Sequence, residues 1–480
     1  MIDFQDTYRE LPKPFFSLQS PTPVKSPGLI AVNEALAKTL KIDPNWLRSE
    51  DGVAVLSGNR ILDNAETIAT KYGGHQFGNW NPQLGDGRAV LLGEVLSVDN
   101  QRFDVQLKGA GPTPYSRGGD GRSPIGPVIR EYIVSEAMAA LGVPTTRALA
   151  AVTTGEDVRR THVAPGAILT RVAKSHIRVG TFEYFSDAVD LETFRSFVHY
   201  VIDRHYPMCR DDDNPIVALL SSVLERQAHL IARWQLLGFI HGVMNTDNML
   251  VCGETVDYGP CAFMDNFEMG KVFSSIDRHG RYAYNNQPLI GQWNIAQFAS
   301  TLIPLIDDDR SLAIATAQSI VDTFPDVFSN AFQQRFNRKI GLGTVLPDDD
   351  ALMTSYFSTM EKAESDFTLT FRALDTTDDR IQYPLPDAFK SWIDDWENRM
   401  AEETTTEDER REMMDAENPF FIPRNHRVEA AIDAAESGDY APFHRLNRAL
   451  SDPYNYREEF AELLAPPKRD EIVHKTFCGT

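Results

Sequence analysis

Apolar residues recur at every third or fourth position in two long segments of the chain. From Ile216 to Leu237 they form a continuous helical stripe, and Gly238 follows it as a typical helix stop. The same spacing extends over residues 127–141, where Gly142 ends the segment in the same way. The sequence therefore predicts an amphipathic helix in each segment.

Strand periodicity surrounds the shorter of these helices. Phe103, Val105 and Leu107 alternate with polar residues, as in a half-buried strand. Further short strands are predicted over residues 89–95, 148–153, 166–172, 249–252 and 261–264. Strands, one helix, more strands and then mostly helices follow one another along the chain, which predicts an α+β fold.

The two ends of the chain have weaker patterns. Helical spacing is present near residues 29–40 and over 292–302, and Pro304 predicts the end of the second of these helices. Residues 310–480 have mostly helical patterns interrupted by acidic runs. On patterning grounds we interpret those runs as solvated helix faces and loops rather than as a partner-binding tail.

The overall composition excludes several classes of function. A net charge of -22 over 480 residues argues against a nucleic-acid partner, because phosphate neutralisation needs clustered Lys and Arg. The chain has no run of about 18 apolar residues, so no membrane span is expected. Its N-terminus has no basic segment followed by an apolar run, so no signal peptide is expected. Four cysteines are too few for a disulfide scaffold, which predicts a cytoplasmic protein.

Two glycine-rich loops lie in the first half of the chain. In the first, Gly85 and Gly87 precede Arg88 between two extended segments. Paired glycines let the backbone turn its N–H groups toward phosphate oxygens, although Asp-Gly is also the signal of a plain hairpin. In the second, Asp120 and Gly121 belong to the run RGGDGR, which fits either a nucleotide contact or a simple connector.

Basic residues of the predicted strands are candidate phosphate partners. Lys108 ends an alternating strand, where a kinase-type lysine pairs with phosphate and with a helix glutamate. The next helix offers Glu131 and Glu136, and we choose Glu131 because it is on the turn nearer the strand end. Arg171 and Arg178 can reach one site from a strand end and the loop after it, and a guanidinium suits phosphate oxygens. Taken singly, each of these residues also fits a solvated surface charge.

The most specific pattern begins directly after the long helix. Residues 241–251 read HGVMNTDNMLV, and residues 257–259 read DYG. Protein kinases carry H-x-D-x-x-x-x-N in the catalytic loop and D-F-G shortly after it. Asn248 and Asp257 take the positions of the metal ligands, and their hard oxygen atoms suit Mg²⁺. Val243 stands where the kinase aspartate would be. The alternative is a buried loop whose polar residues only satisfy backbone groups.

The motifs and the order of elements together predict a protein-kinase-like bilobal fold with an N-terminal and a helical C-terminal extension. We expect four parts, namely an N-terminal extension (1–75), a nucleotide-binding N-lobe (76–155), a C-lobe with the catalytic loop and the D-Y-G motif (156–309), and a mostly helical C-terminal region (310–480).

At these motifs the chain resembles the SelO family, also called YdiU, of protein adenylyltransferases, the pseudokinase-type family of selenoprotein O. The resemblance covers most of the chain, from the run KYGGHQFG at residues 71–78 to the terminal Cys478. It implies transfer of AMP from ATP to Ser, Thr or Tyr hydroxyls of proteins, with ATP bound end for end relative to kinases. UMP transfer from UTP with Mn²⁺ is implied for bacterial members.

The resemblance also implies a role for each matching residue. The metal, Mg²⁺ or Mn²⁺, would be held by Asn248 and Asp257. Asp247 is the implied proton acceptor for the attacking hydroxyl. A nearby divalent cation keeps such a carboxylate ionised and so a weak base, which gives orientation more weight than proton removal. Nucleotide contacts are implied for Gly85, Gly87, Arg88, Lys108, Asp120, Gly121, Arg171, Arg178 and Asp257.

Two features depart from the patterns to which the chain is compared. Val243 cannot accept a proton, which would disable a conventional kinase. The family often carries Cys or selenocysteine near the C-terminus, in some bacterial members joined by a disulfide to a cysteine in the loop after the D-x-G motif. Cys478 matches the first position, but residues 262–300 contain no cysteine, so this redox control is not expected here.

Two other functions fit the same residues. One is an atypical phosphotransferase, and the other is a non-catalytic ATP-binding scaffold, which Val243 motivates. A scaffold needs no second metal ligand, so the retained pair of Asn248 and Asp257 favours an enzyme.

Overall fold

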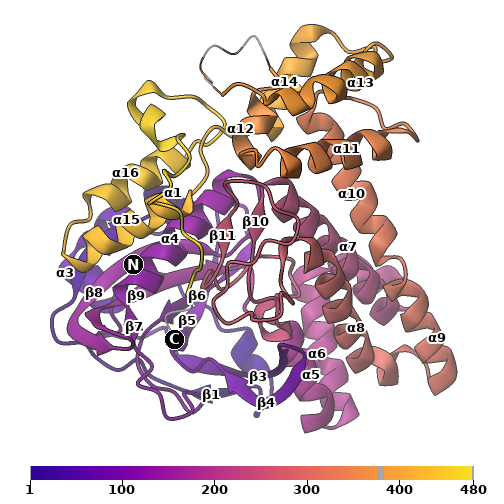
Figure 1. The fold of residues 1–480 in the computed structure, drawn as a ribbon. Coiled ribbons are helices and arrows are strands. Elements are labelled where there is room, and N and C mark those ends of the chain that lie inside the picture. The colour runs from indigo at the N-terminus through magenta and orange to yellow at the C-terminus, as the bar shows by residue number, and fades with distance from the viewer. Residues whose placement is uncertain (1, 376–377, 379, 381–382, 478–480) are drawn as a thin grey trace.

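The computed structural model of the protein describes residues 2–375, 378, 380 and 383–477. The long strands lie within residues 28–173, and most of the helices follow them (Figure 1). The strands are β1 (Phe16–Leu18), β2 (Gly28–Val32), β3 (Ile68–Gln76), β4 (Asn79–Gly85), β5 (Ala89–Leu96), β6 (Arg102–Lys108), β7 (Ser123–Pro124), β8 (Arg147–Arg159), β9 (Val163–Ala173), β10 (Phe239–Ile240) and β11 (Ala262–Phe263).

The helices confirm the α+β class, because all but four of those described follow the last long strand. They are α1 (Glu34–Thr39), α2 (Pro44–Arg48), α3 (Glu50–Leu56), α4 (Ile125–Ala140), α5 (Val179–Ala188), α6 (Leu191–His205), α7 (Pro215–Leu236), α8 (Gln287–Ile306), α9 (Arg310–Val321), α10 (Phe324–Lys339), α11 (Asp349–Lys362), α12 (Phe367–Arg372), α13 (Lys390–Met400), α14 (Glu407–Glu417), α15 (Asn425–Glu436) and α16 (Ala441–Leu450). The helices predicted over 127–141 and 216–237 are confirmed as α4 and α7.

One antiparallel sheet of nine described strands forms the N-terminal half. Its main path runs β1-β3-β5-β6-β9-β8-β2, with β4 paired to β3 and β7 paired to β9. The predicted strands over residues 89–95, 103–108, 148–153 and 166–172 are confirmed as β5, β6, β8 and β9. The first two strands of the chain, β1 and β2, pair at opposite ends of this path. The four-part division of the chain stays a prediction.

Three local predictions are wrong. The segment predicted as a helix over residues 29–40 begins as strand β2, which pairs with β8. Helix α1 starts only at Glu34, where the Asn33 side chain accepts a hydrogen bond from Leu36 N as an N-cap. Pairing across 125 residues therefore overrides the local helical spacing in β2.

The other two errors concern residues 249–252 and Pro304. Residues 249–252 form isolated bridges, Met249 to Thr255 and Leu250 to Arg178, and not a strand. Helix α8 passes through Pro304 and ends at Ile306. Because proline has no N–H, the carbonyl of Ser300 has no helical hydrogen bond. Ser300 is exposed, so water can satisfy that carbonyl.

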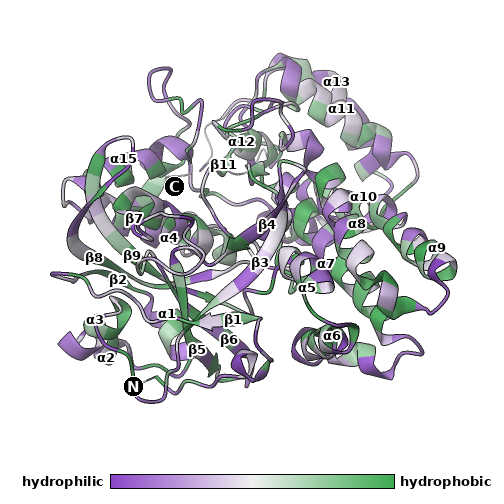
Figure 2. Ribbon diagram, turned by 90° about the horizontal axis from the view of Figure 1, so that it is seen from below, coloured by the Kyte–Doolittle hydropathy of each residue, from purple (hydrophilic) through white to green (hydrophobic). Residues whose placement is uncertain are grey.

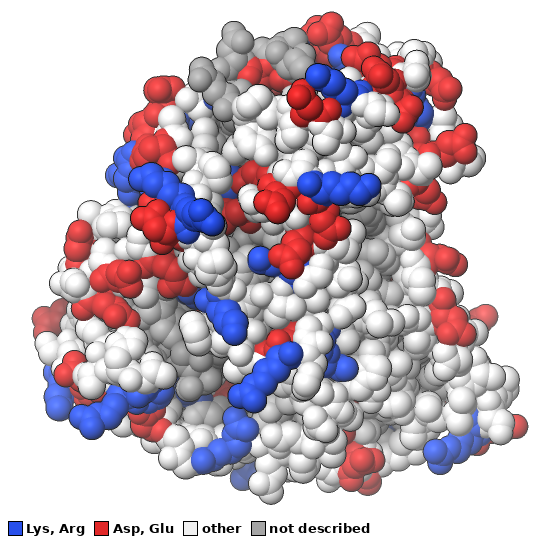
Figure 3. Space-filling model, viewed as in Figure 1, with Lys and Arg blue, Asp and Glu red and all other residues white. Residues whose placement is uncertain are grey.

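Two buried clusters position the site. Helix α4 packs between strands β8 and β9 on one side and helices α15 and α16 on the other, so the C-terminal helices return to cover the N-terminal half (Figure 1). Helices α5 to α9 form the second core, and α7 and α8 lie at its centre (Figure 2). Acidic side chains gather over the α13 and α14 end of the face shown in Figure 3. None of the described helices is long and apolar enough to cross a membrane.

Candidate active site

A cavity of about 710 Å³ lies where the sheet meets the loops that follow α7. Its lining includes every residue that the sequence assigned to the site, although these come from segments as far apart as β4 and the D-Y-G loop. They are Gly85, Gly87, Arg88, Lys108, Asp120, Gly121, Glu131, Arg171, Arg178, Asp247, Asn248 and Asp257. Val243 lines the same cavity.

Four charged side chains meet on one wall of this cavity. Lys108 Nζ lies 2.6 Å from Glu131 Oε2 and also donates to Asp257 Oδ1. Arg171 Nη1 lies 2.8 Å from the same Asp257 oxygen and 3.2 Å from Glu131 Oε1. Glu136, the alternative partner, instead accepts two hydrogen bonds from Arg147. The sheet register produces the cluster, because β6 places Lys108 two residues after Gln106, which pairs with Arg171 on β9.

The cationic neighbours keep Asp257 ionised. Burial alone would raise the pKa of this carboxyl, but Lys108, Arg171 and Arg178 together hold its pKa well below the ordinary value. The Asp257 backbone is in the left-handed region, with φ of 63°. A non-glycine residue there is uncommon, and it marks a loop whose conformation the surrounding contacts impose.

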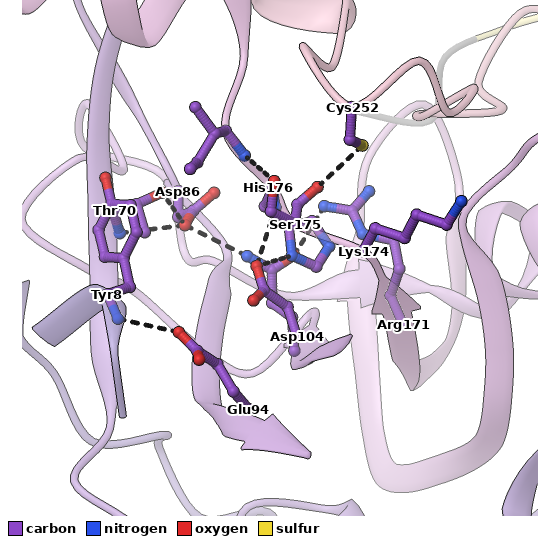
Figure 4. Close-up of polar contacts among 12 residues, drawn as sticks. Tyr8, Thr70, Asp86, Glu94, Asp104, Arg171, Lys174, Ser175, His176 and Cys252 are labelled. Atoms are coloured by element: carbon purple, nitrogen blue, oxygen red, sulfur yellow. Dashed lines mark hydrogen bonds and ion pairs between the residues drawn. The ribbon is translucent and has the colours of Figure 1, made fainter. Parts of the chain in front are cut away.

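Arg178 is a deeply buried cation with weak anionic partners. Its relative exposure is 1%, and its nearest carboxylate oxygen, Asp86 Oδ1, is 3.6 Å away. The guanidinium lies over the ring of Tyr72, 4.2 Å from the centroid. The other oxygen of Asp86, Oδ2, accepts hydrogen bonds from the Thr70 backbone N and hydroxyl, which share its negative charge (Figure 4). Arg178 therefore brings a positive charge to the cavity that the protein does not fully neutralise.

The first glycine loop leaves no room for side chains. Gly85 has φ of 146°, and a Cβ there would lie 2.5 Å from the ring of Tyr115. A Cβ on Gly87 would lie 2.8 Å from the Tyr115 carbonyl oxygen. The segment around Tyr115 approaches both positions so closely that each requires glycine. The two glycines bring the backbone before Arg88 to the cavity surface.

The second glycine loop is held by an arginine that sequence reasoning missed. Arg160 donates to both oxygens of Asp120, at 2.7 Å and 2.9 Å, and its hydrogen bond lowers the pKa of Asp120. Asp120 Oδ1 also accepts from Arg122 N. Gly121 has φ of 65°, and a Cβ there would lie 2.1 Å from the Gly111 backbone. Only the bidentate geometry reveals Arg160, which lies 40 residues away on the β8–β9 hairpin.

Hydrogen bonds fix the conformation of the loop after α7. His241 is fully buried, and burial lowers its pKa, so the ring is neutral. Its Nε2 contacts the Val256 carbonyl at 2.9 Å, which makes Nδ1 the acceptor for Val243 N at 3.3 Å. Asn248 Nδ2 donates to the Val243 carbonyl at 3.0 Å. This last bond identifies the nitrogen of the Asn248 amide and leaves the amide oxygen for another ligand.

Asp247 is enclosed more tightly than the sequence suggested. Its Oδ2 accepts a hydrogen bond from Gln76 Nε2 at 3.1 Å, and its Oδ1 is buried with no hydrogen bond from the described residues. Burial raises the pKa of Asp247 to about 6. Gln76 is the second residue that sequence reasoning missed, although it belongs to the run KYGGHQFG that carries part of the family resemblance.

The donor set fits a divalent cation. Lys108 and Arg171 both bind Asp257 Oδ1, so among the described residues no hydrogen bond occupies Oδ2. The Asn248 amide oxygen is the second hard donor, and phosphate oxygens and water complete the shell that Mg²⁺ prefers. Cys209, Cys252 and Cys261 are buried and do not line the cavity, and Cys478 lies outside the described residues.

Comparison with known proteins establishes the class. Residues 1–451 match the family described as "Protein adenylyltransferase SelO". The chain is 51% identical over 485 residues to "Protein nucleotidyltransferase YdiU" of Bradyrhizobium diazoefficiens, a match that covers 99% of each chain. It is 52% identical to the Rhizobium etli protein of the same name over 99% of this chain and 97% of the relative. The Nitrobacter hamburgensis protein of the same name is 50% identical, over 100% of this chain and 96% of the relative.

These matches make the chain a protein nucleotidyltransferase. Within that class it belongs to the SelO family of protein adenylyltransferases, as the motifs at residues 84–88, 241–248 and 257–259 predicted.

Proposed function

We propose that the protein transfers AMP from ATP to Ser, Thr or Tyr hydroxyls of proteins, with ATP bound end for end relative to kinases. The observation that carries the proposal is the burial of Arg171 and Arg178 at 2% and 1% exposure beside Lys108. Three cations at the inner end of a cavity favour the β- and γ-phosphates there, which leaves the α-phosphate toward Asp247.

A protein-kinase-like arrangement supports an ATP and metal site, and Val243 argues against phosphate transfer there. Lys108 on a strand pairs with Glu131 on the next helix, and Asp257 follows the loop after the long helix α7, in the order that kinases use. Val243, 7% exposed, takes the place of the kinase base, so nothing at that position can receive a proton.

In the proposed reaction the acceptor oxygen bonds to the α-phosphorus. The bond from that phosphorus to the oxygen bridging to the β-phosphate breaks, and pyrophosphate leaves with that oxygen. Asp247 orients the acceptor hydroxyl and takes its proton, while Lys108, Arg171 and Arg178 hold the leaving pyrophosphate. Asn248 and Asp257 would hold Mg²⁺ or Mn²⁺, which when bound offsets negative charge on the pyrophosphate. UTP would be used in the same way for UMP transfer.

Transfer of label from ATP tests the orientation. With ATP labelled at the α-phosphate, we expect protein-bound label, and with ATP labelled at the γ-phosphate we expect none, because only AMP is transferred. Label from the γ position alone would instead mean a phosphotransferase. ATP-dependent thermal stabilisation without either label would mean a scaffold.

Val243→Asp tests whether the missing base alone separates this chemistry from phosphorylation. We expect no γ-phosphate transfer from this variant, because the orientation of ATP is set by the buried cations and not by residue 243. The measurement is γ-labelled ATP with a generic protein acceptor, beside the wild-type protein. Phosphate transfer by the variant would contradict the prediction.

A further inference from the structure

Three consecutive residues at the end of β3 contact three consecutive residues of the loop that contains Asp247. His75 N donates to Thr246 Oγ1 at 2.7 Å, and Phe77 N donates to Asn245 Oδ1 at 3.0 Å. Between them, Gln76 Nε2 donates to Asp247 Oδ2 at 3.1 Å. The two segments are about 170 residues apart in sequence, at a separation of 171 for the Gln76 contact. This contact belongs to the run KYGGHQFG, in which Tyr72 lies against Arg178 but the nucleotide contacts proposed above assign no role to residues 74–77.

A second layer fixes the same contact. Glu183 on α5 accepts a hydrogen bond from the Thr246 hydroxyl and pairs with His75 Nδ1 at 2.6 Å. Tyr282 donates its hydroxyl to Asn245 Oδ1 at 2.5 Å. The strand end and the loop are therefore held as one body, and their relative position does not depend on the single Gln76 hydrogen bond.

Gly74 brings β3 directly against Asp247. A Cβ on Gly74 would lie 2.9 Å from Asp247 Cβ and 3.0 Å from Asp247 Oδ1. Both distances are shorter than ordinary carbon–carbon and carbon–oxygen contacts. Asp247 Oδ1 is accordingly enclosed, and it has no hydrogen bond from the described residues. Oδ2 is left as the oxygen that can receive a proton.

We propose that residues 74–77 form a positioning device for the acceptor step, in which Gly74 encloses Oδ1 of Asp247 and Gln76 orients Oδ2 toward the acceptor hydroxyl. This inference rests on the proposed function of Asp247. Gln76 is a positioning residue, because it acts through Asp247. A carboxylate oxygen has room for two hydrogen bonds, so Oδ2 can keep Gln76 while it accepts from the hydroxyl. The fixed orientation removes a rotational freedom that would otherwise slow transfer.

The test is the variant Gln76→Met, which keeps the side-chain length and removes the donor. We expect kcat for α-label transfer to fall about 10- to 100-fold, as for a misplaced catalytic group. KM for ATP should stay within about twofold, because Gln76 does not contact the proposed phosphate-binding residues. The matched control is Gln292→Met, which removes a glutamine donor on α8 whose hydrogen bond, among the described residues, goes to the Val321 carbonyl, and it should transfer at the wild-type rate.

A double-mutant cycle with Asp247→Asn separates positioning from a structural effect. If Gln76 acts through Asp247, adding Gln76→Met to Asp247→Asn lowers kcat by no more than about twofold further. Gly74→Ala is a second, independent variant that should also lower kcat. Gly270→Ala is its control, since a Cβ at Gly270 has no heavy atom within 4 Å.

The outcomes separate this inference from the proposed function. Wild-type kcat for Gln76→Met, or a full additional loss in the Asp247→Asn background, overturns the positioning role. Wild-type kcat for Asp247→Asn alone overturns the role of Asp247 in transfer. The unfolding temperature of each variant identifies any loss of folding, and nucleotide-induced stabilisation reports ATP binding independently of transfer.

Discussion

Asp257→Ala is expected to lower AMP transfer about a thousandfold or more, which corresponds to several kcal/mol of lost stabilisation. The variant loses the proposed carboxylate ligand of the metal and leaves Lys108 and Arg171 without the oxygen that both of them bind. The fold should survive, because Glu131 still pairs with both cations. The measurement is α-label transfer at saturating ATP and Mg²⁺, together with the unfolding temperature.

Asp257→Asn serves as the control for charge. It keeps an oxygen that can face a metal but removes the negative charge, so we expect intermediate activity that rises with metal concentration. Wild-type transfer from well-folded Asp257→Ala would show that the metal ligand lies elsewhere.

Arg178→Met is expected to weaken ATP binding by roughly 30-fold or more, since truncation of one partner of a buried charge pair costs about 2 kcal/mol or more. The nucleotide-free protein should lose little stability. The nearest carboxylate to Arg178, that of Asp86, is 3.6 Å away and keeps its hydrogen bonds from Thr70 and Gln106, and the other contacts of Arg178 are with the His176 carbonyl and the Tyr72 ring. Isothermal titration with ATP and thermal unfolding without it measure the two effects separately.

Arg171→Met is the comparison for that result. Arg171 pairs with Asp257 and Glu131 and donates to Gln106, so its removal leaves buried carboxylates with less compensation. We expect it to destabilise the free protein by about 3–5 kcal/mol. If Arg178→Met destabilises the protein as much as Arg171→Met, Arg178 is a structural residue and the assignment to phosphate is wrong.

The residues of the cavity could be predicted because short local sequence patterns indicate their chemistry. The spacing from His241 to Asn248, the D-Y-G run and the alternation that ends at Lys108 each need only a few neighbouring residues. The choice of Glu131 over Glu136 also depended on a local feature, its place on the helix turn nearer the strand. Such local patterns bring these residues to one cavity because short segments set the geometry, while their roles in binding and transfer stay predictions.

The wrong predictions and the missed residues depend on features that short local patterns do not contain. Residues 29–32 fall within the segment predicted as a helix over 29–40, yet pairing with β8 makes them part of a strand, and the partner lies more than 100 residues later. Pro304 stays inside α8 because Pro304 itself and Ser300, whose carbonyl it leaves unpaired, are exposed to water, which no local rule states. Arg160 and Gln76 could not be found as site residues because their partners, Asp120 and Asp247, are distant in sequence.

The sequence by itself determined the α+β class, the segments that carry the charged groups and the proposed metal ligands, and the absence of a base at Val243. The tertiary structure decided how those groups face one another. It encloses one oxygen of Asp247 against Gly74, it leaves Arg178 underneutralised, and it brings helix α15 back to the cavity. The physical reason is that periodicity and spacing fix which face a residue occupies, whereas long-range packing and burial fix the charge balance and orientation within the site.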